Sequence, residues 1–297
     1  MSQSSPPRPS TIGLIGGSGV MGRMFRRLFE SDGYRVLVAG RSTDLTYEDL
    51  AAAADVVIVT VPIRNTVALL QRIGPHLRPG QLLSDFTSIK QEPVEAMLAT
   101  PADVIGCHPV FGPMADPAGQ NVVLCPVRPG EHLPWFRGWF ESHGMNVLTM
   151  TPQAHDESMA YVQGLTHFLN IMFARTLQTR SADLDSLLQV CSPVYRLFFA
   201  VLCRILSGDA ELYGQIQITN RENLPVVREF LDNGFDFLRR VNERDWGGIT
   251  RLFEEAADFL GDYKTRARTE SDFLIERLKE LLEAEPAPGR NTPEFDR

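Results

Sequence analysis

Two stretches of the sequence combine residue types and spacings that can do chemistry. In Gly17-Ser18-Gly19-Val20-Met21-Gly22 the three glycines are spaced as in loops that bring backbone N–H groups against a pyrophosphate. The other stretch is centred on His108, whose imidazole titrates near neutral pH and can take up a proton as a general base. Together they predict a site that binds a dinucleotide and moves a proton.

The glycine-rich stretch stands between an expected strand and an expected helix. Residues 11–16 form a short apolar run, and apolar residues recur at helical spacing after the last glycine. In this context Gly17 allows a tight turn, Gly19 lets backbone amides approach a pyrophosphate, and Gly22 lets the helix pack close to the strand. The pyrophosphate then lies at the helix N-terminus, where unpaired N–H groups and the helix dipole favour negative charge.

The end of the second expected strand, Tyr34–Ala39, bears on which dinucleotide binds. Folds that prefer NAD place an acidic residue near this point to accept hydrogen bonds from the ribose 2′-hydroxyl. Here Gly40, Arg41 and Ser42 follow the strand, and the next acid is Asp44. A guanidinium beside a hydroxyl suits a 2′-phosphate, so we expect NADP rather than NAD as the cofactor, in contact with Arg41 and Ser42. The alternative is that Arg41 is a solvated loop residue and the cofactor is NAD.

Alternating strands and helices continue through residues 11–152. The strand expected over Asp55–Pro62 is almost continuously apolar, as in parallel strands that are buried on both faces. The pattern predicts an α/β dinucleotide-binding domain with a doubly wound parallel sheet of the Rossmann type, in which ligands bind beyond the carboxyl ends of the strands. Ser88 and His108 each follow a further expected strand, so both belong to that edge of the sheet.

The chain changes character after Pro152. Apolar residues recur at intervals of three to four residues from Ala154 to Arg180, and further helical segments follow without a convincing strand. Residues 153–284 are therefore expected to form an all-α domain, whose surplus of large apolar residues favours burial against a second copy in a homodimer. Residues 1–10 and 285–297 are rich in proline and polar or charged residues and are expected to be a disordered leader and tail.

The composition excludes several classes of function. The 297 residues carry a net charge of −8, which argues against a general nucleic-acid binder. No apolar run approaches the roughly 20 residues needed to span a membrane, and the N-terminus lacks the apolar core of a signal peptide. The four cysteines have neither CxxC nor metal-ligand spacing, so we expect reduced thiols, no bound metal and a cytoplasmic protein.

From residue 11 to about residue 270, the order of several short motifs resembles the prephenate dehydrogenase family. The motifs are the glycine-rich turn at Gly16–Gly22, V-P-I at Val61–Ile63, D-x-x-S-x-K at Asp85–Lys90, H-P-x-F-G-P at His108–Pro113, H-D-x-x-M-A at His155–Ala160, H-F at His167-Phe168, S-P-x-Y-R-L at Ser192–Leu197 and R-x-N-L at Arg221–Leu224. The resemblance implies oxidative decarboxylation of a cyclohexadienyl dicarboxylate, with hydride transfer from C4 to NAD(P). Some members carry a fused chorismate mutase or regulatory domain, and we expect neither here.

The resemblance also implies roles for individual residues. His108 bonds the substrate hydroxyl as the catalytic base, Ser88 bonds either His108 or that hydroxyl, and Arg221 clamps the ring carboxylate. The other expected contacts are Lys90, His167 and Asn220 with the substrate, and Val61 and Pro62 with the cofactor beside the glycine-rich turn. From the residues alone, a helix N-cap is the better interpretation of Ser88, and a surface lysine in a first helical turn is the equal alternative for Lys90.

Helix geometry refines two of these expectations. At about 100° per residue, His155 and His167 lie some 120° apart around one continuous helix, so they are not expected to face one point, and the resemblance implies that His167 faces the substrate. His155, with Asp156, is then expected at the helix N-terminus or between the domains. Pro225 follows Arg221 closely, at a place where a helix interior excludes proline, so the helix is expected to kink or restart there.

Several alternatives remain open at this point. Prephenate is the first expected substrate, with 4-hydroxyphenylpyruvate and CO2 as products. The same chemistry on 4-amino-4-deoxyprephenate gives 4-aminophenylpyruvate, and on arogenate it gives tyrosine; the residues around His108 do not separate a hydroxyl from an amine. β-Hydroxyacid dehydrogenases use a lysine in a helical domain, yet residues 151–263 contain no lysine. A non-catalytic NADP-sensing protein would keep the glycine-rich turn but would not need His108, Ser88 and Arg221 together.

Overall fold

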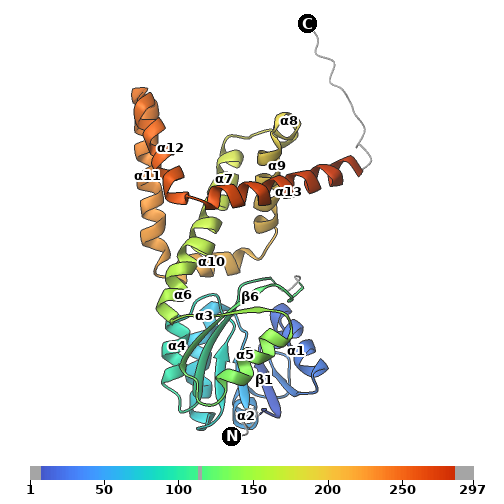
Figure 1. The fold of residues 1–297 in the computed structure, drawn as a ribbon. Coiled ribbons are helices and arrows are strands. Elements are labelled where there is room, and N and C mark those ends of the chain that lie inside the picture. The colour runs from blue at the N-terminus through green and yellow to red at the C-terminus, as the bar shows by residue number, and fades with distance from the viewer. Residues whose placement is uncertain (1–7, 113–115, 285–297) are drawn as a thin grey trace. The chain divides into compact units, whose positions relative to one another are not determined.

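The computed structural model describes residues 8–112 and 116–284 of the chain. Its contacts divide the chain into two compact units (Figure 1). The first is formed by the chain up to Thr166 together with Ala210–Val227, and the second by His167–Asp209 together with the chain from Arg228 onward. The first unit contains the whole sheet, whereas the second is helical.

The first unit is built on one seven-stranded sheet. Its strands are β1 (Thr11–Ile15), β2 (Arg35–Ala39), β3 (Val56–Val59), β4 (Leu82–Asp85), β5 (Asp103–Pro109), β6 (Asn121–Arg128) and β7 (Asn146–Thr149), in the order β2-β1-β3-β4-β5-β6-β7. Neighbouring strands are parallel except β5 and β6, which are antiparallel. Because β1 pairs with both β2 and β3, the direction of winding reverses at β1, where sheets of this kind bind their ligands.

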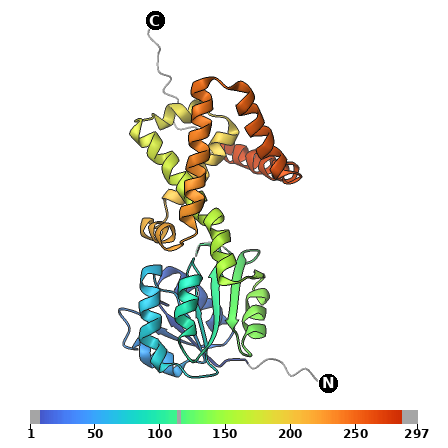
Figure 2. The ribbon, with the colours of Figure 1, turned by 90° about the vertical axis from the view of Figure 1, so that its left-hand side faces the viewer.

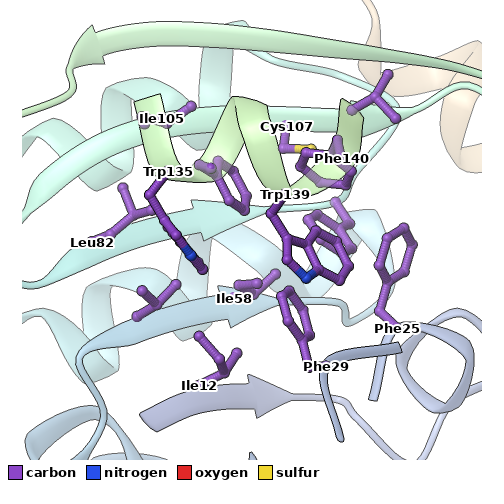
Figure 3. Packing of buried hydrophobic residues seen from close by; sticks show 14 of the residues in the cluster. Ile12, Phe25, Phe29, Ile58, Leu82, Ile105, Cys107, Trp135, Trp139 and Phe140 are labelled. Atoms are coloured by element: carbon purple, nitrogen blue, oxygen red, sulfur yellow. The ribbon is translucent and has the colours of Figure 1, made fainter. Parts of the chain in front are cut away.

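Helices α1 (Val20–Ser31) and α5 (Leu133–Ser142) cover one face of the sheet (Figure 3). Their aromatic side chains are buried against residues of the central strands such as Ile12 and Ile58. Phe29 of α1 stacks on Trp139 of α5, with ring centroids 4.0 Å apart. Burial of one such side chain contributes about 1.5–3 kcal/mol, so this layer holds α1, and with it the glycine-rich turn, against β1.

Helices α2 (Tyr47–Ala53), α3 (Ile63–Ile73) and α4 (Gln91–Leu98) cover the opposite face, and a short 3-10 turn, η1 (Gly74–His76), follows α3. Leu50, Leu70 and Met97, one from each helix, are fully buried in a second apolar cluster. Residues of β3 alternate between the two clusters, which explains why this strand is apolar at every position.

Part of the helical region packs with the sheet. Helix α6 (Pro152–Met159) leads into a π-helical segment, η2 (Ala160–Leu165), which belongs to the same unit. Helix α10 (Ala210–Thr219) also joins this unit, where its Ile216 is buried with Ile63 and Ile89. The first unit is thus a sheet with two layers of helices and a small helical cap from later in the chain.

The second unit contains helices only, within the part of the chain that is described (Figure 2). Phe173 of α7 packs edge-on against Phe198 of α9, with ring centroids 4.9 Å apart. Several large apolar side chains are exposed on α11 and α12, among them Phe235, Phe253 and Phe259. The helices are α7 (Thr166–Thr179), α8 (Leu184–Val190), α9 (Pro193–Leu206), α11 (Asn223–Glu243), α12 (Trp246–Leu260) and α13 (Tyr263–Ala284); α7 and α11 begin in the first unit.

The structure confirms the expected fold class, a doubly wound and mostly parallel α/β sheet followed by helices. The antiparallel pairing of β5 with β6 was not expected; the short segment between them cannot hold the crossover helix that parallel pairing needs. The single helix expected over Ala154–Arg180 is interrupted by η2.

Residues 1–7 of the expected leader and the whole expected tail, residues 285–297, lie outside the described residues. Within the described part of the leader, Ser10 donates hydrogen bonds to Asp55 from its backbone N–H (2.9 Å) and from its hydroxyl (2.7 Å). The contacts keep α6, η2 and α10 with the sheet, and the domain boundary expected after residue 152 stays a prediction.

Candidate active site

The glycine-rich turn has the geometry of a phosphate-binding loop. Gly16, at its start, has a φ of +88°, which side chains disfavour. A Cβ on Gly22 would lie 2.5 Å from the Cα of Gly17 and 2.6 Å from the carbonyl oxygen of Gly16, so only glycine lets α1 begin this close to β1. Gly19 is the N-cap of α1, and no side chain among the described residues caps the helix. The first N–H groups of α1 are therefore available to an anion, and the turn fits a dinucleotide pyrophosphate.

The turn after β2 lies against this loop. A Cβ on Gly40 would lie 2.9 Å from the hydroxyl oxygen of Ser18, and the hydroxyl of Thr43 accepts a hydrogen bond of 2.8 Å from the Gly40 N–H. Arg41 and Ser42 follow Gly40 and are exposed. Both side chains are open to solvent, and their contact with a cofactor stays a prediction.

A buried chain of hydrogen bonds runs from the end of β5 to the start of α4. Nδ1 of His108 in β5 lies 2.8 Å from Nε2 of His155 in α6. Nδ1 of His155 in turn lies 2.7 Å from Oδ1 of Asp156. The exposed fractions of the three residues are 2%, 0% and 3%. We call these three residues the His–His–Asp chain.

Local structure at two helix N-termini holds this chain. The hydroxyl of Thr151 caps α6 by accepting a hydrogen bond of 3.1 Å from the Ala154 N–H. The carboxylate of Asp156 accepts hydrogen bonds from the backbone N–H groups of Lys90 (2.8 Å) and Gln91 (2.9 Å), and so caps α4. Hydrogen bonds to a charged acceptor contribute about 1.5–3 kcal/mol each, so Asp156 ties α6 firmly to α4.

Burial keeps the two histidines neutral. It lowers the pKa of His108 well below the ordinary value, and the neighbouring His155 and Lys90 lower that pKa further. Burial also lowers the pKa of His155, although the hydrogen bond with Asp156 opposes the effect. A neutral imidazole has one bare ring nitrogen, so His108 is able to accept a proton.

A buried ion pair lies next to His108. Lys90 has an exposed fraction of 0% and pairs with Asp85 at the end of β4. Its ammonium also donates to the carbonyl oxygen of Cys107 at 2.8 Å, and so holds the backbone that carries His108. Gly106 makes room for this side chain, because a Cβ there would lie 3.2 Å from Cδ of Lys90. The ammonium is occupied by protein groups, and the expected contact of Lys90 with substrate stays a prediction.

Arg221 lies between α10 and α11, with 81% of its side chain exposed, and pairs with Glu92 at 2.8 Å. Asn220, next to it, is buried and donates a hydrogen bond of 2.9 Å to the carbonyl oxygen of Asp156. This bond brings the segment that carries Arg221 beside the His–His–Asp chain. The helix restarts here, one of the two expected outcomes: α11 begins at Asn223, which puts Pro225 in the first turn, where no backbone N–H is needed.

The remaining residues predicted from the sequence lie in three places. Ser88 is half-buried between β4 and α4; Nδ1 of His108 bonds His155 and not Ser88. Val61 and Pro62 follow β3 after one residue, Thr60, and β3 is the neighbour of β1 in the sheet. His167 is in α7, and burial lowers its pKa. The roles of these residues toward substrate and cofactor stay predictions.

Other chemistries find little support. Burial raises the pKa of the Cys107 thiol well above its ordinary value and that of Cys125 to about 12, so both thiols stay protonated and are poor nucleophiles. Over residues 8–112 and 116–284, no three His, Cys, Asp or Glu side chains gather in a way that could hold a metal ion. No helix in the same residues is both long and apolar enough to cross a bilayer.

That His155 and Asp156 are partners of His108 was not predicted from the sequence. The expected angle of 120° between His155 and His167 holds only for a continuous α-helix, whereas η2 is a π-helix, in which each residue turns through a smaller angle. The sequence offered one signal for these partners, a histidine followed directly by an aspartate one turn into an expected helix. The burial of Lys90 was also missed, although an acid at a strand end followed by the first lysine of the chain suggests an ion pair.

The fold and the site define a nucleotide-binding protein of the Rossmann class. A buried histidine lies at the edge of its sheet where ligands are expected to bind. Comparison with known families agrees. The sequence model described as "Prephenate dehydrogenase, nucleotide-binding domain" matches residues 37–134, and the one described as "Prephenate dehydrogenase, dimerization domain" matches residues 151–255.

Individual proteins are similar over most of the chain. The T-protein of Haemophilus influenzae is 34% identical over 91% of this chain and 72% of its own length. The 4-amino-4-deoxyprephenate dehydrogenase of Streptomyces pristinaespiralis is 29% identical over 84% of this chain and 91% of its own. The structure of Aquifex aeolicus prephenate dehydrogenase with hydroxyphenyl propionate and NAD+ shares the fold, with a TM-score of 0.65 at 19% identity over 89% of this chain and 99% of that chain. The chain belongs to the prephenate dehydrogenase family, as its motifs predicted.

Proposed function

We propose that this protein catalyses the NAD(P)-dependent oxidative decarboxylation of prephenate to 4-hydroxyphenylpyruvate and CO2. The observation that carries the proposal is the neutral, buried His108 at the carboxyl end of β5, in the sheet whose β1 ends in a phosphate-binding turn. Family membership supports an oxidoreductase. The interpretation as a non-catalytic NADP sensor gains no support from the comparisons.

The reaction defines a task for His108. A bound oxidised nicotinamide supplies the hydride acceptor. The bare ring nitrogen of His108 accepts the proton of the substrate's 4-hydroxyl while the C4–H bond breaks and its electron pair leaves as hydride. The carbonyl formed at C4 then draws in the electron pair of the bond to the ring carboxylate. That bond breaks, CO2 leaves, and the phenol oxygen of the aromatic product takes the proton back from His108. General base catalysis of this kind contributes roughly 10²–10⁴-fold.

Arg221 is proposed to bind the ring carboxylate. A guanidinium binds a carboxylate through two parallel hydrogen bonds, and Asn220 holds the segment of Arg221 beside the His–His–Asp chain. The ion pair of Arg221 with Glu92 is largely exposed and contributes only about 0–1 kcal/mol, so a substrate carboxylate can replace Glu92 at little cost. The half-buried Ser88 is proposed to bond the substrate hydroxyl.

We propose NADP as the preferred dinucleotide, because Arg41 and Ser42 are exposed beside the glycine-rich turn. Comparison of kcat/KM for the two dinucleotides tests this proposal. Arg41→Ala is expected to lose about tenfold or more with NADP and little with NAD, since it removes one charge-assisted contact. Arg35→Ala, at the opposite end of β2, is the matched control. Equal losses of Arg41→Ala with both dinucleotides would contradict the preference.

The substrate is tested with purified protein and three candidates: prephenate, 4-amino-4-deoxyprephenate and arogenate, each with NADP and with NAD. We expect the highest kcat/KM with prephenate. The similarity to the Streptomyces pristinaespiralis enzyme makes 4-amino-4-deoxyprephenate the second candidate, and an imidazole accepts a hydrogen bond from an amine as it does from a hydroxyl. If no combination yields reduced nicotinamide, the proposed function is wrong.

We further propose that the chain forms a homodimer through its helical part. The match to a dimerization domain over residues 151–255 supports this assembly. So do the large apolar side chains exposed in the second unit, such as Trp246 (80%) and Phe259 (89%). Sedimentation velocity tests the assembly.

The four free cysteines support a reducing compartment, and we propose the cytoplasm, which cell fractionation tests.

A further inference from the structure

We infer that His155 and Asp156 are positioning residues that fix the tautomer of His108, with the proton on Nδ1 and the bare lone pair on Nε2. The inference rests on the proposed function, because the position of the lone pair matters only if His108 accepts a proton from substrate. It assigns a role to two residues that lie behind the imidazole, on the side of Nδ1.

The carboxylate of Asp156 fixes the tautomer of His155. An aspartate is ionised at neutral pH and then only accepts hydrogen bonds. The backbone N–H groups of Lys90 and Gln91 already donate to Asp156, at 2.8 and 2.9 Å. The contact of 2.7 Å between Asp156 Oδ1 and His155 Nδ1 therefore requires the His155 proton to be on Nδ1.

The tautomer of His155 in turn fixes that of His108. His155 is buried and neutral, so a proton on its Nδ1 leaves Nε2 as an acceptor. The contact of 2.8 Å between this Nε2 and Nδ1 of His108 then requires a proton on the His108 Nδ1. Since His108 is neutral as well, its lone pair lies on Nε2, which bonds none of the described residues and is left for a substrate.

The other titratable groups around the two rings do not change this order of protons. Lys90 and Asp85 pair with each other, and the Lys90 ammonium donates to a backbone carbonyl. The thiols of Cys107 and Cys125 stay protonated, because burial raises the pKa of both. The carboxylate of Asp156 is therefore the charged group that orders the two rings.

The tautomer can be measured without turnover. Nitrogen-15 NMR of histidine-labelled protein distinguishes a protonated from a bare ring nitrogen, and the His108 signals are assigned by their loss in His108→Gln. We expect a protonated Nδ1 and a bare Nε2 in the wild type. In Asp156→Leu no oxygen accepts from Nδ1 of His155, so we expect neither ring to keep the wild-type tautomer as its single form. His132→Gln is the control: this histidine contacts Gly80 near the start of β5 and is not expected to alter the His108 signals.

The NMR spectra of both the wild type and the variant can overturn the inference. A wild-type His108 with its proton on Nε2 overturns the inference, and so does an Asp156→Leu protein that is folded with an unchanged His108 tautomer. If Asp156→Leu does not fold, which the role of Asp156 as the cap of α4 makes a risk, the wild-type spectrum decides alone.

Kinetics separate positioning from mere support of the fold. His155→Gln keeps an oxygen that can accept from Nδ1 of His108, whereas His155→Phe fills the site without an acceptor. We expect kcat to fall about 10²-fold or more in His155→Phe and Asp156→Leu and less than about tenfold in His155→Gln, with KM changing little. Equal kcat values for the Phe and Gln variants overturn the inference. If the tautomer is as inferred but the wild type turns over no candidate substrate, the proposed function fails and the tautomer assignment stands.

Discussion

Replacing Gly22 by alanine tests how closely α1 must approach β1 for the dinucleotide to bind. The added Cβ would lie 2.5 Å from the Cα of Gly17 and 2.6 Å from the carbonyl oxygen of Gly16, whereas carbon atoms in contact lie about 3.5–4.0 Å apart. Both obstacles are backbone atoms, so the start of α1 must move by about 1 Å. Overpacking of this kind costs about 1–3 kcal/mol, partly offset by up to about 1 kcal/mol from the better helix propensity of alanine.

The same shift moves the first N–H groups of α1. We expect Gly22→Ala to lose one charge-assisted hydrogen bond to the pyrophosphate, or about 1.5–3 kcal/mol, which raises Kd for the dinucleotide roughly 10–100-fold. Calorimetric titration with NADP+ measures this affinity, and urea denaturation measures the free energy of unfolding. Gly138→Ala is the matched control, because a Cβ on this glycine of α5 meets no atom within 4 Å. It should gain about 0.5–1 kcal/mol of stability and bind the dinucleotide as the wild type does.

A Gly22→Ala protein that is as stable as Gly138→Ala and binds NADP+ as tightly as the wild type would refute this reasoning. A loss of stability without a loss of affinity would show that α1 is packed tightly but that its N-terminus does not hold the pyrophosphate.

Three further predictions follow from the buried charges and the exposed arginine. Lys90→Met leaves the carboxylate of Asp85 buried without its partner and should cost about 3–5 kcal/mol in urea denaturation; a loss below about 1 kcal/mol would contradict the importance of this pair. Burial lowers the pKa values of His108 and His155, so below pH ~6.5 the unfolded chain binds more protons than the folded one. The free energy of unfolding should be fully retained above that pH and fall as the pH drops below it, by up to about 1.4 kcal/mol per histidine and pH unit; a flat profile between pH ~6.5 and ~5 would contradict this. Arg221→Ala should raise KM about tenfold or more with little change in kcat, and it should leave the free energy of unfolding within about 0.5 kcal/mol of the wild type. A fall in kcat at constant KM would contradict the role of Arg221 in binding substrate and would give it the role proposed for His108.

The fold was predictable where local pattern and tertiary environment agree. The apolar strands and the glycines of the phosphate-binding turn can be recognised from residues that are adjacent in the sequence. Strand β3, for example, is apolar at every position because both of its faces are buried. The antiparallel pairing of β5 with β6 depends on which strands meet in space, and its one signal in the sequence is the connecting segment, which is too short for a crossover helix. The π-helical η2 was likewise invisible, since its apolar residues recur almost as they do in an α-helix.

The residues of the candidate site also differ in whether a local sequence pattern could place them. His108 could be placed at the edge of the sheet, since it directly follows an expected strand. Its partner His155 comes from a helix that begins 43 residues later, after two further strands (α6 starts at Pro152 and β5 ends at Pro109). Only the packing of α6 on α4, fixed by the Asp156 carboxylate, brings the two imidazoles to 2.8 Å. Contacts of this kind depend on tertiary packing, and a single sequence does not reveal them.

The most direct test of the central claim is the balance of products from prephenate. Reduced nicotinamide and released CO2 are measured together for the wild type and for His108→Gln. We predict equal amounts of both from the wild type, and for the variant a kcat that is lower by roughly 10²–10⁴-fold for both products with little change in KM. The account would be contradicted by a wild type that forms no reduced nicotinamide, or by a His108→Gln variant that is as active as the wild type.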